Sequence, residues 1–315
     1  MKERCVYIDI IKAFAIFLVV FGHVIQFWLY ADTWWNERIF LIIYSFHMPL
    51  FMMISGLVVG MYRKPMGYRS FIQKRFCQLM VPYLSWAVID CLRKPNLEIV
   101  NIIVYPNNFL WFLWALFFIS VLIEPCLYIS KVKRRMFSYV FLMILLFGMG
   151  KLLGGIFALD KIRNLIVFYV LGIEFSQYKN YKRIISKCVY CFPLWVIMAF
   201  NVRWGGNYGN SIISNVYAFI MSFAGCLSFI SLFFLLEDTF NKKYMLKTGQ
   251  STLGIYAVHY LLIDVLVSSL KLNGNVVIAI VGTFCVILLS LFVIAFIRQN
   301  IVLSFLLLGI KNEKR

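Results

Sequence analysis

Histidine is the residue type in this chain best suited to proton transfer, and its three copies, His23, His47 and His259, all fall in long apolar segments. A neutral imidazole with little water around it can act as a general base. Ionisable groups at membrane depth normally face a protein interior or a water-filled cavity, which indicates a functional site. The alternative for each histidine is a hydrogen bond that only bridges two helices. Because no histidine occurs elsewhere, the functional interpretation is favoured.

Asp9 and Lys12 precede His23 in the first apolar segment, and on a helix all three share a face. Lys12 and His23 differ by about 20° in direction and by about 16 Å in height, because a helix turns 100° and rises 1.5 Å per residue. Lys12 can guard a cytoplasmic entrance through which an anionic ligand reaches His23. Alternatively, Asp9 and Lys12 simply neutralise each other as an i,i+3 pair. The sequence leaves both readings open.

A proline lies two residues after His47, inside the second apolar segment. A proline within a span frees a main-chain carbonyl, which neighbouring groups or a cavity must satisfy. The spacing therefore predicts a kink beside His47. Counted from the outer ends of their segments, His23 and His47 lie at similar depth, so the two could meet across one helix interface.

Three basic residues, Arg69, Lys74 and Arg75, lie near the cytoplasmic start of the third apolar segment. They can hold phosphate groups through charge-assisted hydrogen bonds. Alternatively, they only follow the rule that cytoplasmic loops are rich in Lys and Arg. No glycine-rich phosphate loop competes as an anion site.

Trp111 and Trp114 lie at the outer end of the fourth apolar segment. Glu124 lies deeper in the same segment. The tryptophans could belong to an aromatic belt at the membrane interface, or they could stack on a sugar ring or gate a tunnel. Glu124 could bridge helices or pair with a cytoplasmic basic residue. The sequence does not choose between these alternatives.

The whole chain has the composition of an integral membrane protein, because 63% of its 315 residues are apolar and only 14% are charged. We predict an all-α, polytopic membrane helix bundle of about ten transmembrane helices with both termini in the cytoplasm. The expected spans are 7–30, 38–61, 76–92, 109–130, 136–156, 162–178, 187–203, 213–236, 251–270 and 275–297. The stretches between them are too short for a soluble domain, so residues 1–315 are expected to form a single membrane domain with no appended soluble domain.

The net charge of +18 would also suit a nucleic-acid binder, but the positive charges sit in short clusters between apolar runs. Most of them fall in the segments assigned to the cytoplasm, which is the pattern that sets membrane orientation. We therefore expect a lipid bilayer and no nucleic acid as partner. Cys188 and Cys191 form a CxxC motif, but no second pair or nearby histidine completes a metal site, so none is predicted.

Several motifs, taken in order, resemble the integral-membrane acyltransferase-3 family, which includes bacterial O-acetyltransferases of surface polysaccharides and glycolipids. Lys12, ten further residues and His23 resemble the family's basic-x10-His signature. The other matching segments are SFHMPLFMMISG at 45–56, FIQKRFCQLMVPYLSW at 71–86, WFLWALF at 111–117, FYVLGI at 168–173 and GQSTLGIYAVH at 249–259. Each motif is weak alone, whereas the ordered set covers nearly the whole chain.

The resemblance implies that His23 is the catalytic histidine and that Lys12, beside Asp9, is the basic residue essential with it. It also implies that segment 71–86 forms part of an acyl-CoA entrance, where Arg69, Lys74 and Arg75 would bind the donor. The family often has Arg-x-x-Arg at this entrance, but here Arg75 is followed by Gln78, so one charge is missing. The candidate substrate-binding residues are His47, Trp111, Trp114 and His259.

The implied reaction moves an acyl group, acetyl in the first place, from cytoplasmic acyl-CoA to a hydroxyl of a cell-surface polysaccharide or lipid-linked glycan. Acyl-CoA would be a co-substrate, and no permanently bound cofactor is expected. The implied location is the bacterial inner membrane, as a multi-pass protein. The alternative is a proton-coupled transporter or flippase for a sugar or a lipid-linked intermediate, because intramembrane ionisable groups also form proton pathways.

Overall fold

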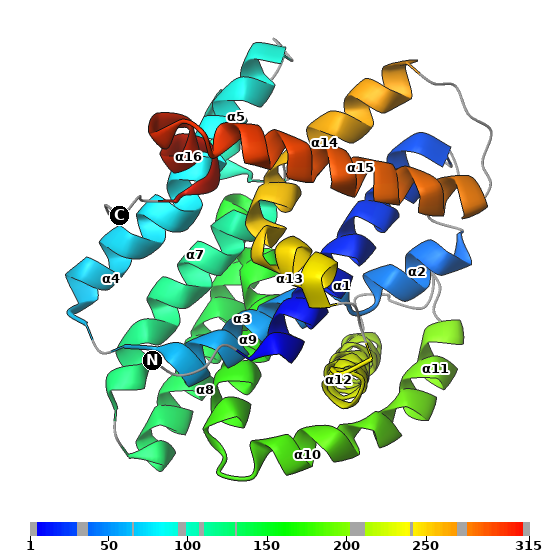
Figure 1. The fold of residues 1–315 in the computed structure, drawn as a ribbon. Helices are drawn as coiled ribbons and strands as arrows, with labels where there is room; N and C mark the ends of the chain where they lie inside the picture. The colour runs from blue at the N-terminus through cyan, green and yellow to red at the C-terminus, as the bar shows by residue number, and fades with distance from the viewer. Residues whose placement is uncertain are drawn as a thin grey trace. The chain divides into compact units, whose positions relative to one another are not determined.

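The computed structural model describes residues 5–29, 37–64, 66–93, 99–106, 110–129, 131–201, 212–239, 242–269 and 276–310, and helices are the regular elements found there. This confirms the all-α fold class. Figure 1 shows the helices as coiled ribbons. The chain divides into two compact units. Unit 1 comprises Met1–Met61 and Gly172–Ile294, and unit 2 comprises Tyr62–Leu171 and Ala295–Arg315. The expectation of a single domain over residues 1–315 stays a prediction.

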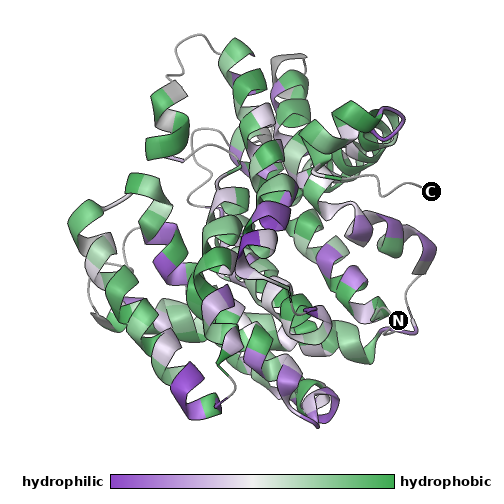
Figure 2. Ribbon diagram, turned by 90° about the vertical axis from the view of Figure 1, so that its left-hand side faces the viewer, coloured by the Kyte–Doolittle hydropathy of each residue, from purple (hydrophilic) through white to green (hydrophobic). Residues whose placement is uncertain are grey.

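Six helical stretches among the described residues are long and apolar enough to cross a membrane. They are Val6–Phe27, Arg38–Tyr62, Trp111–Tyr128, Tyr181–Phe200, Ile213–Leu235 and Val276–Ile297. The other four expected spans also coincide with helices, which are shorter or more polar. Figure 2 shows hydrophobic residues along most of the helical ribbon, with hydrophilic residues in short stretches between them. The helical membrane bundle is therefore confirmed, while the count of ten and the position of the termini stay predictions.

Unit 1 is built mainly from the N-terminal helices and from the second half of the chain. Its elements are α1 (Val6–Val24), η1 (Ile25–Leu29), α2 (Arg38–Tyr44), α3 (His47–Tyr62), α10 (Tyr181–Lys187), η6 (Cys188–Cys191), α11 (Phe192–Phe200), α12 (Ile212–Leu235), α13 (Lys242–Gln250), α14 (Thr252–Ser269) and α15 (Val276–Ile297). The C-terminal part of α9 (Leu159–Gln177) also belongs to it.

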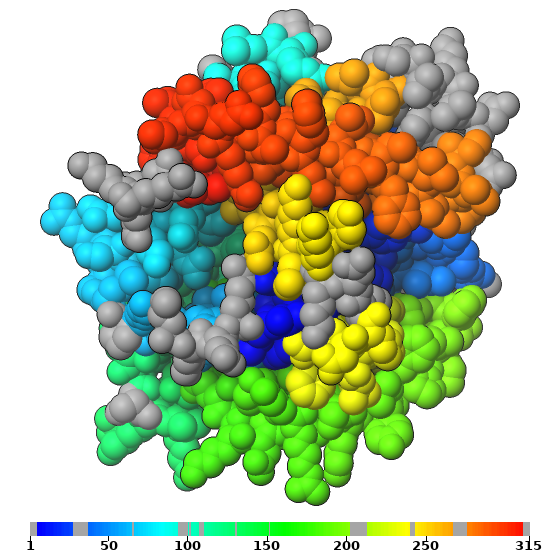
Figure 3. All heavy atoms as spheres, in the orientation of Figure 1, coloured from blue at the N-terminus to red at the C-terminus, as the bar shows by residue number. Residues whose placement is uncertain are grey.

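Helix α1 lies at the centre of unit 1, where it packs against α12, α13 and α14. The close packing of α13 on α1 is visible in Figure 3, where the yellow of α13 adjoins the blue of α1. Gly249, at the end of α13, permits this approach, because a Cβ atom added there would overlap the main-chain carbonyl of Asp9. Gly172 likewise brings α9 against the backbone of α3.

The predicted kink beside His47 is present as a break between α2 and α3 at Ser45 and Phe46. Pro49 has no N–H to offer the carbonyl of Ser45, four residues earlier. That carbonyl instead accepts a hydrogen bond from the Ser222 hydroxyl of α12 at 2.6 Å. A neighbouring helix thus satisfies the freed carbonyl, as the sequence argument requires.

Unit 2 contains the segment with the three basic residues. Its elements are α4 (Tyr68–Arg75), η3 (Phe76–Met80), α5 (Val81–Arg93), α6 (Ile99–Val104), α7 (Trp111–Ile123), η4 (Glu124–Tyr128), α8 (Val132–Leu153), η5 (Ile156–Ala158), the first part of α9, and α16 (Ile301–Leu308). The π-helical turn η3 directly follows Arg75. It is covered by the end of α16, since Gly309 lies against the main-chain carbonyl of Gln78.

Candidate functional site

The histidine pair, His23 of α1 and His259 of α14, is the most distinctive group of polar side chains in unit 1. The two ring centroids are 5.2 Å apart and the ring planes are inclined by 55°. His259 is fully buried. Helices α1 and α14 bring the two side chains together because they pack side by side.

The hydrogen bonds of His259 determine which of its ring nitrogens carries the proton. Nδ1 lies 3.1 Å from the carbonyl of Ile255 and 2.8 Å from that of Tyr256. A carbonyl oxygen only accepts, so in the neutral ring Nδ1 is the protonated nitrogen and Nε2 carries the lone pair. In the part of the chain that the structure describes, Nε2 of His259 and Nδ1 of His23 are buried without a hydrogen-bond partner.

Two aromatic residues that sequence reasoning did not single out flank this pair. Phe27 lies parallel to the His23 ring, with centroids 5.6 Å apart and planes inclined by 5°. Tyr260 stands edge-on to Phe27 and to His23. Phe27 follows His23 by four residues, a helical spacing that already places it on the same face. Tyr260 follows His259 directly, but only the packing of α14 on α1 shows its contact.

His47, at the start of α3, lies on the side of Tyr44. Its ring is 4.5 Å from the Tyr44 ring, and its Nδ1 hydrogen-bonds the Ile43 carbonyl at 2.9 Å. Tyr44 in turn packs on α1 at Gly22, next to His23. The predicted proximity of His47 to α1 is thus mediated by a tyrosine, whereas the ring beside His23 belongs to His259.

Asp9 and Lys12 form an ion pair of 3.9 Å between Oδ1 and Nζ. The side chain of Asp9 is 2% exposed and that of Lys12 is 24% exposed. This distance is at the upper limit for an ion pair, and the partial exposure of Lys12 leaves its charge accessible. The geometry is therefore compatible with both interpretations of the sequence, and the role of Lys12 stays a prediction.

Two of the three basic candidates in unit 2, Arg69 and Lys74, are exposed, and Arg75 is half-buried. The Arg75 guanidinium lies over the Phe71 ring, 5.5 Å from its centroid. It is also within hydrogen-bonding reach of Tyr169, which belongs to the FYVLGI motif of α9. Arg75 is therefore the basic side chain of the three whose contacts with neighbouring rings orient it, while the other two are exposed.

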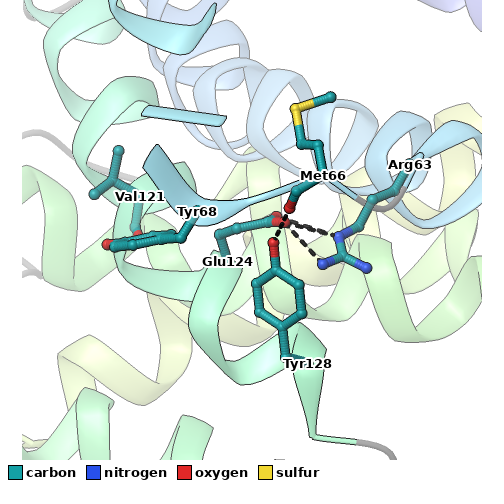
Figure 4. Close-up of polar contacts among 6 residues, drawn as sticks. All are labelled: Arg63, Met66, Tyr68, Val121, Glu124 and Tyr128. Carbon is teal, nitrogen blue, oxygen red and sulfur yellow. Dashed lines mark hydrogen bonds and ion pairs between the residues drawn. The ribbon is translucent and has the colours of Figure 1, made fainter. Parts of the chain in front are cut away.

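Glu124 pairs with a basic residue of unit 2, Arg63, which is one of the two roles that the sequence left open for it. Arg63 forms hydrogen bonds with both carboxylate oxygens, from Nη2 at 2.8 Å and from Nε at 3.0 and 3.3 Å (Figure 4). Its guanidinium also lies over the Tyr128 ring. Burial would lower the pKa of Arg63, but the hydrogen bonds and the charge of Glu124 outweigh it and raise that pKa. We call Arg63, Glu124 and Tyr128 the arginine cluster.

The arginine cluster also fixes the loop that leads into α4. The Tyr128 hydroxyl donates to the Met66 carbonyl, and the Tyr68 hydroxyl donates to the Val121 carbonyl at 3.1 Å (Figure 4). Helix α7 and the turn η4 therefore hold this loop at three points. They thereby position α4, which carries the basic candidates.

The two candidate tryptophans of α7 have different surroundings. Trp114 is buried, and its indole N–H donates to the carbonyl of Phe157 at 3.0 Å. Trp111 is partly exposed, and the Lys161 ammonium lies 4.9 Å from the centre of its ring. Trp111 is therefore the better placed of the two to stack on a sugar. The roles of both in substrate binding stay predictions.

No group of three or more His, Cys, Asp and Glu side chains within the described ranges could hold a metal ion. Cys188 and Cys191 lie together in the short turn η6, and each is partly exposed. The expectation that the protein has no metal site stays a prediction.

Comparisons with known proteins agree with the sequence motifs. A family model of the acyltransferase-3 type, described as an acyltransferase domain, matches residues 6–298. Nodulation protein NolL of Mesorhizobium japonicum is 31% identical over 134 residues, which cover 39% of this chain and 36% of that protein. Nodulation protein NolL of Sinorhizobium fredii is 36% identical over 90 residues, which cover 28% of this chain and 25% of that protein. No solved structure matches.

The similarity to the two nodulation proteins covers only about a third and a quarter of their lengths, whereas the family model covers almost the whole of this chain. The match over residues 6–298 covers most of both units and includes all the candidate residues. It favours an enzyme over the transporter alternative. The chain belongs to the acyltransferase-3 family, whose model covers nearly all of its length.

Proposed function

We propose that this enzyme moves an acyl group, acetyl in the first place, from cytoplasmic acyl-CoA to a hydroxyl of a cell-surface polysaccharide or lipid-linked glycan. His23 is the general base. The observation that carries this proposal is the histidine pair, in which the buried Nδ1 of the partly exposed His23 has no hydrogen-bond partner among the described residues. The proposed location is the bacterial inner membrane, as a multi-pass protein.

The proposed step balances with the side chains present and the two substrates. His23 takes the proton from the acceptor hydroxyl, and the oxygen attacks the thioester carbonyl. The C–S bond breaks as the ester forms, and the thiolate takes the proton back from the His23 imidazolium, which gives CoA thiol. An alternative route of two steps passes through an acyl group on His23.

The surroundings of His23 suit this chemistry. Phe27 and Tyr260 line the imidazole with aromatic surface, which limits the access of water. Exclusion of water protects an activated thioester from hydrolysis. On the same helix face, Lys12 supplies a positive charge for an anionic or polarised donor group.

The donor part of the proposal concerns the basic residues of α4. Arg75, held by Phe71 and Tyr169, would contact a CoA phosphate, and the exposed Arg69 and Lys74 would add charge. For the acceptor, the partly exposed Trp111 offers a surface on which a sugar ring could stack. His47 and Trp114, both buried, would act on the acceptor only through their neighbours.

The proposal is tested by mass spectrometry of surface glycans from cells that carry the wild-type gene, the His23→Ala variant or no gene. We expect acyl-modified glycan only with the wild-type gene. Transfer of label from acetyl-CoA in membrane vesicles then identifies the donor. Label retained on the wild-type protein without acceptor, and lost in His23→Ala, would indicate the two-step route. Normal glycan acylation by a well-expressed His23→Ala variant would contradict the proposal.

A further inference from the structure

We propose that His259 is a positioning residue for His23. During the reaction its Nε2 atom accepts a hydrogen bond from Nδ1 of His23, a bond that the two atoms do not make in this structure, and so directs Nε2 of His23 toward the acceptor hydroxyl. This inference rests on the proposed function, in which His23 is the base. It assigns to His259 a role through another side chain, in place of direct contact with the substrate.

The first support is the fixed orientation of the His259 ring. Its Nδ1–H donates to two main-chain carbonyls of its own helix, those of Ile255 and Tyr256. Those bonds hold the ring and leave Nε2 able only to accept. Because His259 is fully buried, water does not satisfy Nε2 from the surface. Any group that bonds to it must therefore be a donor from within the site.

The second support is the distance to His23. Each ring nitrogen lies about 1.2 Å from its ring centre, so two rings with centroids 5.2 Å apart can bring one nitrogen of each to about 3 Å, the length of a hydrogen bond. His23 Nδ1 is buried and has no partner among the described residues. The His23 ring can donate from its unsatisfied nitrogen, and the His259 ring can only accept at its own, so the two rings complement each other.

The third support is that the imidazolium formed during transfer needs a partner. When His23 takes the acceptor proton, both of its nitrogens carry hydrogen, and the ring becomes positively charged. The lone pair of His259 Nε2 then accepts one N–H, while the face of Phe27, parallel to the ring, favours the cation. Since His259 keeps its own proton on Nδ1 throughout, no proton is transferred to it.

The test uses two amide substitutions that each replace one nitrogen of His259. In His259→Gln the longer side chain places an amide oxygen near the former Nε2, which keeps the acceptor. In His259→Asn the shorter side chain places its amide near the former Nδ1, which keeps the donor to the helix carbonyls but removes the acceptor. His259→Leu lacks both.

The readouts are kcat and the KM for acetyl-CoA, measured as transfer of labelled acetyl from acetyl-CoA in membrane vesicles that contain the full chain and its acceptor. We expect His259→Gln to keep kcat within about tenfold of wild type. We expect His259→Asn and His259→Leu to lose on the order of a hundredfold. The KM for acetyl-CoA should stay unchanged in all three, because His259 does not touch the donor in this proposal.

The opposite ranking overturns the inference. If His259→Asn retains as much activity as His259→Gln or more, then the bond to the helix carbonyls is what matters and His259 is only structural. In the background of His23→Ala, exchanging His259 for Gln or Asn should make no further difference. If His23→Ala itself remains active, the proposed function fails, and that result differs from failure of the inference about His259 alone.

Discussion

The histidine pair of unit 1 and the arginine cluster of unit 2 are both polar groups within apolar helices, but they differ in how their atoms are satisfied. In the arginine cluster, the carboxylate of Glu124 receives three hydrogen bonds from Arg63, and Tyr128 donates to the main chain. In the histidine pair, one nitrogen of each ring is buried without a partner in the described part of the chain.

This difference in hydrogen bonding indicates a structural role for the arginine cluster and a catalytic role for the histidine pair. A buried donor or acceptor without a partner costs about 1–3 kcal/mol, so a fold keeps one only where something compensates. The arginine cluster carries no such cost and connects a loop to a helix turn, which is a structural role. The histidine pair carries the cost at two nitrogens, one on each ring, which is expected where two groups form their hydrogen bond only during the reaction.

The largest effect should come from His23→Ala. Loss of a general base reduces the rate by about 10²–10⁴-fold. We expect acyl transfer to fall by that factor while the amount of protein in the membrane and its thermal unfolding temperature in detergent stay close to wild type. A comparable loss of folded protein would place His23 with the arginine cluster as a structural residue.

The second largest effect should be a loss of unfolding free energy when a residue of the arginine cluster is substituted. Arg63→Ala leaves the Glu124 carboxylate, 1% exposed, without its charged partner, and removal of one member of a buried pair costs about 3–5 kcal/mol. Glu124→Ala should cost less, because Arg63 is 21% exposed and water can solvate it. Thermal unfolding in detergent measures both.

In either variant of the arginine cluster, kcat per folded molecule should stay near the wild-type value. A fall in kcat of a hundredfold without loss of stability would show that the arginine cluster takes part in chemistry. The distinction between the two regions would then be wrong.

A smaller effect is expected at the basic residues of α4. Arg75→Ala should raise the KM for acetyl-CoA by about tenfold, since one charge-assisted hydrogen bond to a phosphate is lost. Higher salt should weaken donor use by the wild type in the same direction. Gln78→Arg should lower the KM, because it restores a second charge three residues later. Depletion of the Arg75→Ala protein with an unchanged KM would mean that the residue only anchors the topology.

The smallest effect concerns the break between α2 and α3. Ser222→Ala removes the hydroxyl that satisfies the Ser45 carbonyl, and a lost buried hydrogen bond costs about 1–2 kcal/mol of unfolding free energy. Ser228→Ala is the matched control, because Ser228 is buried in the same helix but bonds only a carbonyl of that helix. Equal destabilisation by both variants would remove Ser222 from the support of the kink.

Much of the fold follows from local sequence pattern. Within the described residues, each expected span is mainly helical, because a continuous apolar run must satisfy its main-chain hydrogen bonds internally in lipid. The shared face of Lys12 and His23 follows from helix geometry, and the break near Pro49 follows from the missing N–H. These features depend on residues within a few turns of one another, so one sequence is enough to predict them.

The partners across helices could not be predicted in the same way. Depth along a span indicated that His23 and His47 could meet, but the ring in contact with His23 belongs to His259. Depth gives only the height of a residue along its helix. It does not give the direction in which the side chain points around the helix. Glu124 could likewise not be paired with Arg63 from the sequence.

Such contacts arise where helices distant in sequence pack, and small residues set how closely they do so. At Gly249 the absence of a side chain lets α13 lie on the backbone of α1, and α14 continues from there to bring His259 to His23. The sequence specifies which groups are able to do chemistry, whereas packing between distant helices selects which of those groups meet.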